Sequence, residues 1–172
     1  MSEPAVQWLT EPEMAAWRNL VRATTGLLSM LDNDLRAEHG LTFGDYEVLV
    51  HLSEEPGHAI RMSELAGRLH LSPSGITRRI DGLVKSGLVE RQPCPNDRRG
   101  SNAVLTPLGM KTLTTVAPTH VRGVREYFID RLSDRQLAQL SAVMSSIAID
   151  ERRAEGGCDA ADADNGQASS PR

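Results

Sequence analysis

One continuous stretch, residues 61–106, limits the possible folds of this chain more than any other. Within it, Ser72 followed by Pro73 predicts a helix start, because a serine hydroxyl caps free backbone N–H groups and a proline at the first helical position has no N–H to leave unpaired. Gly87 predicts the end of this helix, since glycine readily takes the left-handed conformation that closes helices. Apolar side chains recur between these signals at i, i+4, i+7 and i+8, which predicts one face docked on a small core. They are Ile76, Ile80, Leu83 and Val84.

The opposite face of the same helix is polar and partly basic. It carries Ser74, Thr77, Arg78, Asp81 and Lys85. Hydroxyl groups and an arginine near a helix N-terminus suit base edges and phosphates, because arginine can hold guanine by two hydrogen bonds and the first backbone amides favour phosphate. Taken alone, a polar face of this kind is more often simply solvated, so its meaning depends on the neighbouring elements.

A shorter helix and a tight turn are predicted just before it. Residues 62–70 place Leu65, Ala66 and Leu69 on one side, and Ala66 is small enough to let the following helix cross closely. Two helices joined in this way are the arrangement by which many proteins put a helix into a DNA groove.

A hairpin is predicted just after it. Residues 88–91 and 103–105 have strand-like patterns, and turn-forming residues lie between them. The turn formers are Pro93, Pro95, Asn96 and Gly100, and the tip carries Asp97, Arg98 and Arg99. Thr106-Pro107 then repeats the cap-and-proline start of a helix.

Long helical segments flank this core. Residues 12–38 form a helical pattern that ends at His39-Gly40, Thr42 caps a second helix, and further helices start at Pro107 and at Ser133-Asp134. Pro118 is expected to kink the first of these, because proline removes one backbone hydrogen bond. The end helices carry more apolar surface than the short unit at residues 61–106 could cover. Intertwining with a second copy would bury that surface, and a monomer whose end helices fold back is the rival arrangement.

The order of these elements resembles the MarR family, the winged helix-turn-helix transcriptional regulators of bacteria and archaea, over nearly all of residues 12–150. The most specific match is the wing, Asp97-Arg98-Arg99-Gly100 followed by Ala103-Val104-Leu105-Thr106, which fits the family's D-x-R-[AG] wing with its trailing L-T. The second match runs from Ser63-Glu64-Leu65-Ala66 to Ser86-Gly87-Leu88-Val89.

The resemblance implies a mainly α fold with a small β wing, in which the N- and C-terminal helices form an intertwined homodimer around winged helix-turn-helix cores. We expect an N-terminal extension at residues 1–11 and a MarR-type domain at 12–150. Within that domain the winged helix-turn-helix would span 58–106, and the dimerisation helices 12–39 and 107–150. Residues 151–172 lack any apolar period, which predicts a disordered tail.

The same resemblance assigns residues to DNA. Ser72, Ser74, Thr77 and Arg78 would face the major groove, while Arg79 and Lys85 are weaker candidates for the backbone or solvent. Arg99 would enter the minor groove and Asp97 would pin the wing. The predicted DNA-binding residues are Ser72, Ser74, Thr77, Arg78, Arg79, Lys85, Arg98 and Arg99. A symmetric dimer would read two half-sites about 10 bp apart on double-stranded DNA, so the operator should be near-palindromic.

One residue departs from a well-formed recognition helix. Gly75 lies near its start and costs about 1 kcal/mol against alanine. Either the backbone approaches another group closely there, or the glycine is drift.

The net charge of −4 at first argues against DNA as a partner. Residues 61–106, however, hold eight basic and four acidic residues, a local charge of +4, whereas residues 1–60 carry −7. The positive charge therefore lies where phosphate contact is predicted, and the local field decides binding.

Family members often bind small, commonly aromatic or phenolic ligands between the dimer helices and the DNA-binding lobe. The resemblance therefore implies a repressor that such an effector releases from its promoter. The candidate effector residues are Trp17, Arg18, Tyr46 and His51, each of which also has an ordinary structural explanation.

Other functions find little support in the sequence. There is no nucleophile–base set, glycine-rich phosphate loop or metal cluster among the five dispersed histidines, so we expect no enzyme, cofactor or metal. No run of about 18 apolar residues and no basic-then-apolar leader occurs, so we expect a cytoplasmic protein without membrane contact. Two alternatives stay open: a winged-helix interaction module without DNA binding, and a redox-sensing regulator that uses Cys94. Sensing cysteines in similar proteins typically lie near the N-terminal helix, where this chain has none.

Overall fold

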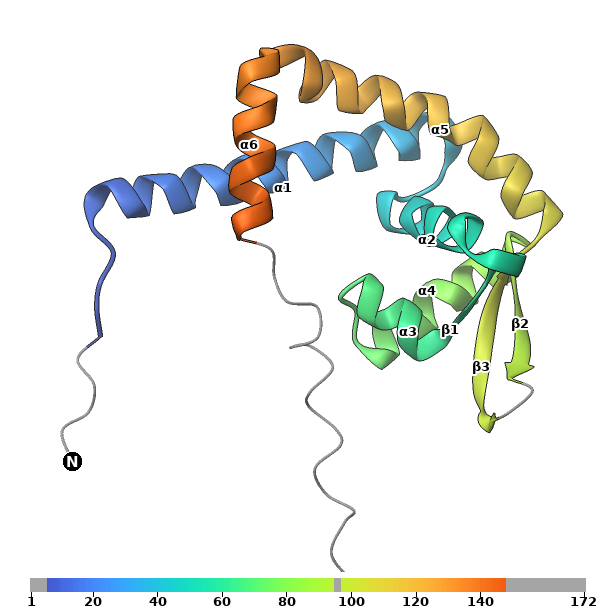
Figure 1. The fold of residues 1–172 in the computed structure, drawn as a ribbon. Coiled ribbons are helices and arrows are strands. Elements are labelled where there is room, and N and C mark those ends of the chain that lie inside the picture. Colours follow the sequence, from blue (N-terminus) through green and yellow to red (C-terminus); the bar gives the residue numbers. More distant parts are fainter. Residues whose placement is uncertain (1–5, 95–96, 148–172) are drawn as a thin grey trace, which may run out of the picture.

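The computed structural model describes residues 6–94 and 97–147, without the side chains of residues 97–99 (Figure 1). The predicted tail at 151–172 and the first five residues of the N-terminal extension therefore lie outside the described residues. Helices α1 (Glu11–His39) and α2 (Phe43–Glu54) come first, and the 3₁₀ turn η1 (Pro56–His58) follows. The central elements are β1 (Ala59–Arg61), α3 (Met62–Arg68), α4 (Pro73–Lys85), β2 (Val89–Cys94) and β3 (Asp97–Leu105). The chain continues with α5 (Pro107–Tyr127), η2 (Ile129–Arg131) and α6 (Asp134–Ser146).

The predicted boundaries of α4 are confirmed. The Ser72 hydroxyl accepts a hydrogen bond from the Gly75 backbone N–H at 3.1 Å, and Pro73 is the first helical residue. Gly87, with φ of 75°, lies two residues beyond the end of the helix and donates its N–H to the Val84 carbonyl. Thr42, Thr106 and Ser133 cap α2, α5 and α6 in the same way. The capping chemistry is local, which is why the sequence predicts these starts well.

The predicted wing is a three-stranded antiparallel sheet in the order β1-β3-β2. Ile60 on β1 pairs with Ala103, and Val89 on β2 pairs with Leu105. The register of β2 and β3 shifts between Pro93 and Cys94, at the outer end of the hairpin.

The core lies where α2, α3 and α4 meet the sheet, the second half of α1 and α5. The largest of its fully buried side chains are Leu35, Val48, Leu49, Leu52, Leu65, Ile76, Ile80, Val89 and Val116. Three of the four predicted apolar positions of α4 belong to this core, whereas Val84 is 39% exposed. The structure is thus mainly helical with a small β wing, as the resemblance implies.

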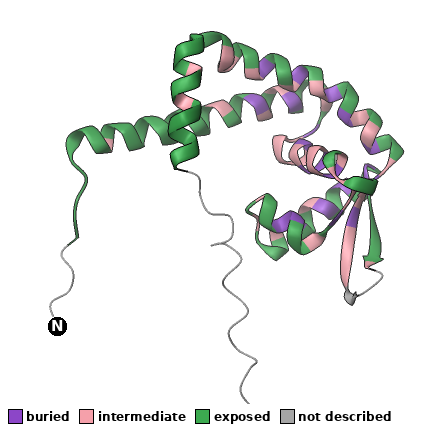
Figure 2. Ribbon diagram, in the orientation of Figure 1, coloured by how far each residue is buried: buried purple, intermediate pink, exposed green. Residues whose placement is uncertain are grey.

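Two helices extend beyond this core (Figures 1 and 2). The 29-residue α1 buries only Leu31 and Leu35, both in its second half, and α6 buries none of its residues. Large apolar side chains on the uncovered parts are exposed to solvent. They include Trp17, Leu20, Val21, Leu28, Val143, Met144 and Ile147. The third long helix, α5, runs as one helix through Pro118. Within the described residues, no helix combines the length and apolarity that a membrane crossing requires.

Gly109 allows α5 to begin against the turn that ends α4. A Cβ atom at this position would lie 2.1 Å from the carbonyl oxygen of Leu88 and 2.7 Å from a methyl carbon of Leu105. The first of these atoms is backbone and cannot turn aside. Gly109→Ala should therefore lower the free energy of unfolding by about 1–3 kcal/mol, the usual cost of overpacking, as measured by urea unfolding.

Gly82→Ala is the matched control for this substitution. Gly82 lies inside α4, and a Cβ atom there would have no neighbour within 4 Å. Alanine should stabilise the helix by up to about 1 kcal/mol. Similar effects of the two substitutions would contradict the close packing at Gly109.

Candidate nucleic-acid interface

The polar face of α4 is open to solvent and lies beside the β2–β3 hairpin (Figure 1). Ser74, Thr77, Arg78 and Lys85 are exposed and follow one another at spacings of three, one and seven residues, which places them on one side of the helix. Ser72 is exposed just before them, where its hydroxyl caps the helix and lies 3.2 Å from that of Ser74. Five of the predicted DNA-binding residues thus share one surface.

The wing residues can be placed only by their backbone. Asp97 begins β3 and pairs with Cys94, and Arg98 and Arg99 continue the strand. Their side chains lie outside the described residues, so the roles predicted for Asp97, Arg98 and Arg99 stay predictions.

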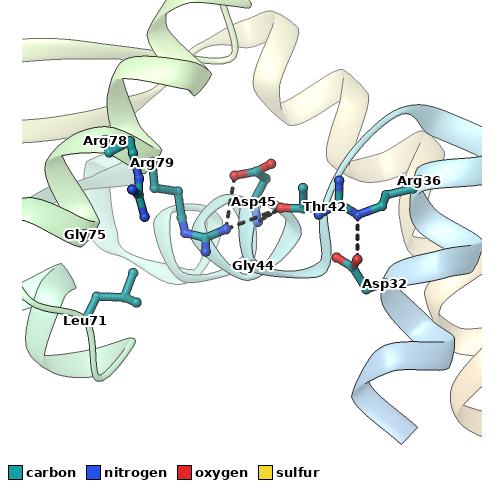
Figure 3. Close-up of a pocket in the computed structure, with 9 residues that line it drawn as sticks. All are labelled: Asp32, Arg36, Thr42, Gly44, Asp45, Leu71, Gly75, Arg78 and Arg79. Atoms are coloured by element: carbon teal, nitrogen blue, oxygen red, sulfur yellow. Dashed lines mark hydrogen bonds and ion pairs between the residues drawn. The ribbon is translucent and has the colours of Figure 1, made fainter. Parts of the chain in front are cut away.

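Arg79 points away from the exposed face and joins α4 to α2 (Figure 3). Its Nη1 lies 3.2 Å from a carboxylate oxygen of Asp45 and 3.3 Å from the hydroxyl of Thr42, and its side chain is 29% exposed. The structure therefore separates Arg79 from the other predicted DNA contacts and gives it two partners within the protein.

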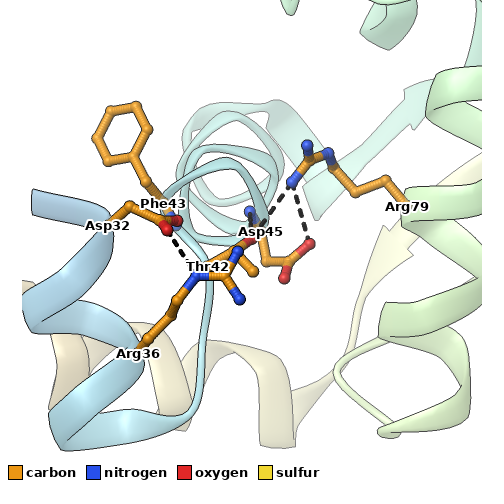
Figure 4. A network of polar contacts seen from close by, with 6 residues as sticks. All are labelled: Asp32, Arg36, Thr42, Phe43, Asp45 and Arg79. Atoms are coloured by element: carbon orange, nitrogen blue, oxygen red, sulfur yellow. Dashed lines mark hydrogen bonds and ion pairs between the residues drawn. The ribbon is translucent and has the colours of Figure 1, made fainter. Parts of the chain in front are cut away.

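The contacts of Arg79 continue as far as α1 (Figure 4). Asp32 on α1 accepts a hydrogen bond from the backbone N–H of Phe43 at 2.7 Å and pairs with Arg36 at 2.5 Å. The hydrogen bond from Arg36, followed by that from Phe43, holds the pKa of Asp32 below its ordinary value. A chain of polar contacts thus runs from α1, through the start of α2, to the recognition helix.

Gly44 makes room for this connection. A Cβ atom at Gly44 would lie 2.2 Å from Nη1 of Arg79, so the guanidinium occupies the space that a side chain would need. Gly75 on α4 has a milder restriction, because a Cβ atom there would lie 3.2 Å from the Ser72 hydroxyl. This hydroxyl is the cap of the same helix, and Asp45 occupies the equivalent position behind the cap Thr42, so the contact does not by itself require a glycine. Both glycines line an open cleft of about 260 Å³ between α2 and α4 (Figure 3).

Arg91 on β2 is a further residue of this surface, and the sequence alone did not single it out. Its Nη2 donates to the backbone carbonyl of Thr77 at 3.2 Å and pairs with a carboxylate oxygen of Asp81 at 2.8 Å. A lone arginine on a strand carries no signal that its partners lie ten and fourteen residues earlier on a helix.

A second cavity, of about 230 Å³, lies between α2 and α5. It is lined by Phe43, Tyr46, Glu47, Val50, His51 and His120. Of the four predicted effector residues, it brings together Tyr46 and His51. Trp17 and Arg18 lie elsewhere, on the exposed first half of α1. No local sequence pattern groups His120 with Tyr46, but their ring centroids are 4.6 Å apart.

Burial disfavours charge in this cavity. Burial lowers the pKa of His120 below the ordinary value of a histidine and raises the pKa of Glu47 above the ordinary value of a glutamate. Nδ1 of His120 is buried without a hydrogen-bond partner among the described residues. The aromatic and apolar lining and the cost of charge there suit an uncharged aromatic molecule.

Metal and cysteine chemistry gain no support from the described part of the chain. No group of three or more His, Cys, Asp or Glu residues within it could hold a metal ion. Cys94 is partly buried at the end of β2, where its thiol donates to the side-chain oxygen of Asn102 at 3.0 Å. Redox sensing by Cys94 stays a prediction.

Comparison with known proteins places this fold in one class, the winged helix-turn-helix regulators. The structure superimposes on AbsC, a MarR family transcriptional regulator from Streptomyces coelicolor, with a TM-score of 0.78 and 40% identity, over 88% of this chain and 99% of that one. Sco3205, a MarR family regulator from the same organism in complex with DNA, gives a TM-score of 0.79 and 36% identity, over 85% and 91% of the two chains. The transcriptional repressor YetL of Bacillus subtilis is 28% identical, over 66% of this chain and 70% of its own.

The family model for MarR proteins matches residues 39–100, the segment that holds the recognition helix and most of the wing. Together with 40% identity to AbsC over nearly the whole of that protein, this match shows that the chain belongs to the MarR family.

The contact between Gly44 and Arg79 predicts that Gly44→Ala has a different effect on stability in two backgrounds. Gly44→Ala in the native chain should bring little or no stabilisation, because the gain in helix propensity, below about 1 kcal/mol, is offset by displacement of the guanidinium. In an Arg79→Met background the same substitution should stabilise the protein. Urea unfolding of the four proteins measures both effects, and an equal effect of Gly44→Ala in both backgrounds would show that the two residues do not interact.

The buried imidazole of His120 predicts a pH dependence of stability. Because its pKa is lowered in the folded state from the ordinary value of 6.5, the unfolded chain takes up a proton first as the pH falls, and stability is lost below about pH 6.5. His120→Phe keeps an aromatic ring against Tyr46 and removes the titrating group. As the pH is lowered from about 7.5 to about 5.5, the free energy of unfolding of the variant should therefore rise relative to that of the native protein, as measured by urea unfolding. Glu47 and Asp32 are present in both proteins, so their contributions cancel, and a difference that does not change with pH would refute the assignment.

Proposed function

We propose that this protein is a sequence-specific, DNA-binding transcriptional regulator that acts as a homodimer. The observation that carries the proposal is the exposed polar face of α4, with Ser74, Thr77 and Arg78 near its N-terminus, beside an arginine-bearing hairpin. The complex of Sco3205 with DNA, at 36% identity, supports it. Such a regulator works where the DNA is, which in a bacterium or archaeon is the cytoplasm.

In this proposal α4 enters the major groove and the wing enters the adjacent minor groove. Ser72, Ser74, Thr77 and Arg78 contact base edges and nearby phosphates, and Lys85 contacts the backbone. Arg98 and Arg99 belong to the wing contacts, and Asp97 holds the wing in shape. Arg79 holds α4 against α2 through Asp45 and Thr42 and contributes no direct DNA contact.

The second copy covers the exposed apolar side chains of α1 and α6. Trp17 on α1 is 57% exposed and Val143 on α6 is 51% exposed. A symmetric dimer buries both sets at once and sets two recognition helices at a fixed separation. It binds two half-sites about 10 bp apart, so the operator is near-palindromic.

Repression by promoter occlusion is the mode of action we favour, in line with the name of the relative YetL. The effector is an uncharged aromatic molecule that enters the cavity of Tyr46, His51 and His120. That cavity is formed by α2 and α5, and α2 is tied to the recognition helix through Arg79, so a ligand there can change the position of α4. Trp17 and Arg18 lie on the part of α1 that the second copy would cover.

The test is fluorescence anisotropy of the purified protein with DNA from the region upstream of its own gene, at two salt concentrations, with random DNA as the control. Tight binding of that DNA at two subunits per site, weakened by salt, is the expected result. Absence of salt-dependent binding to any DNA would leave the chain as a protein-interaction module.

Arg78→Ala tests the orientation of the recognition helix. The substitution should weaken operator binding by about 1–3 kcal/mol and relax discrimination at one base step, because the guanidinium can no longer pair with a base edge. Lys111→Ala removes one exposed positive charge from α5 and is the control. Unchanged discrimination between operator and random DNA in the Arg78 variant would contradict the assignment.

A further inference from the structure

The side chain of Arg91 reaches from the wing to the recognition helix. Its guanidinium contacts the Thr77 carbonyl at 3.2 Å and the Asp81 carboxylate at 2.8 Å. Thr77 and Asp81 lie one helical turn apart on the exposed side of α4. The charged end of Arg91 therefore lies beside the face of α4 that the proposed function assigns to DNA.

The position of Arg91 can be related to the grooves of DNA. When a helix occupies the major groove and a wing occupies the adjacent minor groove, one sugar–phosphate backbone passes between them, because it is the wall that separates the two grooves. Arg91 joins β2 to α4 across this gap. A positive charge held there faces the backbone rather than the bases.

We propose that Arg91 binds a backbone phosphate of the operator, a role that rests on the proposed function. The guanidinium has five N–H donors in a fixed fork, so it can hold the Thr77 carbonyl and a phosphate together. In the free protein Asp81 occupies the place of that phosphate. The Asp81 side chain is 61% exposed and that of Arg91 is 36% exposed, and an ion pair so open to solvent is weak enough for a phosphate to replace it.

A purely structural role would make different predictions. If Arg91 only braced α4, its loss would disturb the fit to the operator more than binding to random DNA, and loss of Asp81 would do the same harm. A phosphate contact is independent of base sequence, so its loss weakens binding to both DNAs alike. Removal of Asp81 would then free Arg91 and strengthen binding.

The experiment compares Arg91→Met, Arg91→Lys and Asp81→Asn with the native dimer in anisotropy titrations over a range of salt concentrations, with operator and random DNA. Methionine keeps much of the apolar stem of arginine and removes the charge. Arg91→Met should weaken binding to both DNAs by roughly ten-fold, as for the loss of one charged hydrogen bond, and lower the slope of log K against log salt by about one. Arg91→Lys should keep the slope, and Asp81→Asn should raise the affinity by about two- to five-fold.

Glu90→Gln is the matched control, since it neutralises a neighbouring acid on β2. The Glu90 carboxylate accepts a hydrogen bond from the side-chain amide of Gln92 at 2.7 Å. If Glu90→Gln and Asp81→Asn raise the affinity for DNA equally, the increase comes from the total charge of the protein. That result would overturn the proposal that a phosphate replaces Asp81 on Arg91. A loss on operator DNA alone, an unchanged salt slope in Arg91→Met, or a loss in Asp81→Asn would overturn the phosphate contact.

A folding measurement and the binding of the native protein keep the possible failures separate. Circular dichroism melting shows whether each variant folds, and if Arg91→Met does not, Arg91→Lys and Asp81→Asn still decide the outcome. Native protein that shows no salt-dependent DNA binding would end the proposed function and this contact together. If the native protein binds DNA and Arg91→Met binds it equally well, only the role proposed for Arg91 is ruled out.

Discussion

Burial of the apolar side of α4 is the constraint on which the rest of the structure depends. Ile76, Ile80 and Leu83 insert into the core, and this alone decides which side of the helix faces solvent. Ser74, Thr77 and Arg78 are thereby placed on the outer surface. The same core also receives Val89 at the base of the wing, so helix and hairpin are oriented by one set of contacts. The exposed face of α4 and the β2–β3 hairpin are thus supported by the same apolar core.

Two arginines show how position decides the role of a residue type. Arg79 follows Arg78 directly, yet it turns toward α2, where Gly44 leaves space and Asp45 supplies the opposite charge. Arg91 comes from the neighbouring strand and reaches the other flank of the same helix. The recognition helix is therefore held on two sides by ion pairs as well as from below by the core. The Arg79 side continues through Thr42 to Phe43, whose backbone is bound by Asp32 of α1.

The sequence predicted those features that depend on short-range chemistry. Caps such as Ser72 and Thr106 and the stop at Gly87 act within a few residues of themselves, and their positions agree with the structure. Of the turn formers predicted for the wing, Pro93 and Gly100 lie within β2 and β3, and Pro95 and Asn96 lie outside the described residues. The partners of Arg79 and the approach of His120 to Tyr46 join residues 34 or more positions apart, and no local pattern encodes them. The family resemblance therefore made Arg79 a candidate for the DNA backbone or solvent without indicating its partners on α2. It also grouped Trp17 with Tyr46, although only Tyr46 lies in the cavity.

The exposure of the first half of α1 bears on how the stability of this protein depends on its concentration. The first half of α1 buries none of its residues, so in the proposed dimer this helix would obtain its support from the second copy, and folding and association would be linked equilibria. The stability of such a protein rises with its concentration, and a dilute chain is the form most open to local unfolding and to proteases. A repressor of its own gene with this property would have a lower limit to its abundance set by the dimer's dissociation constant, independently of any effector.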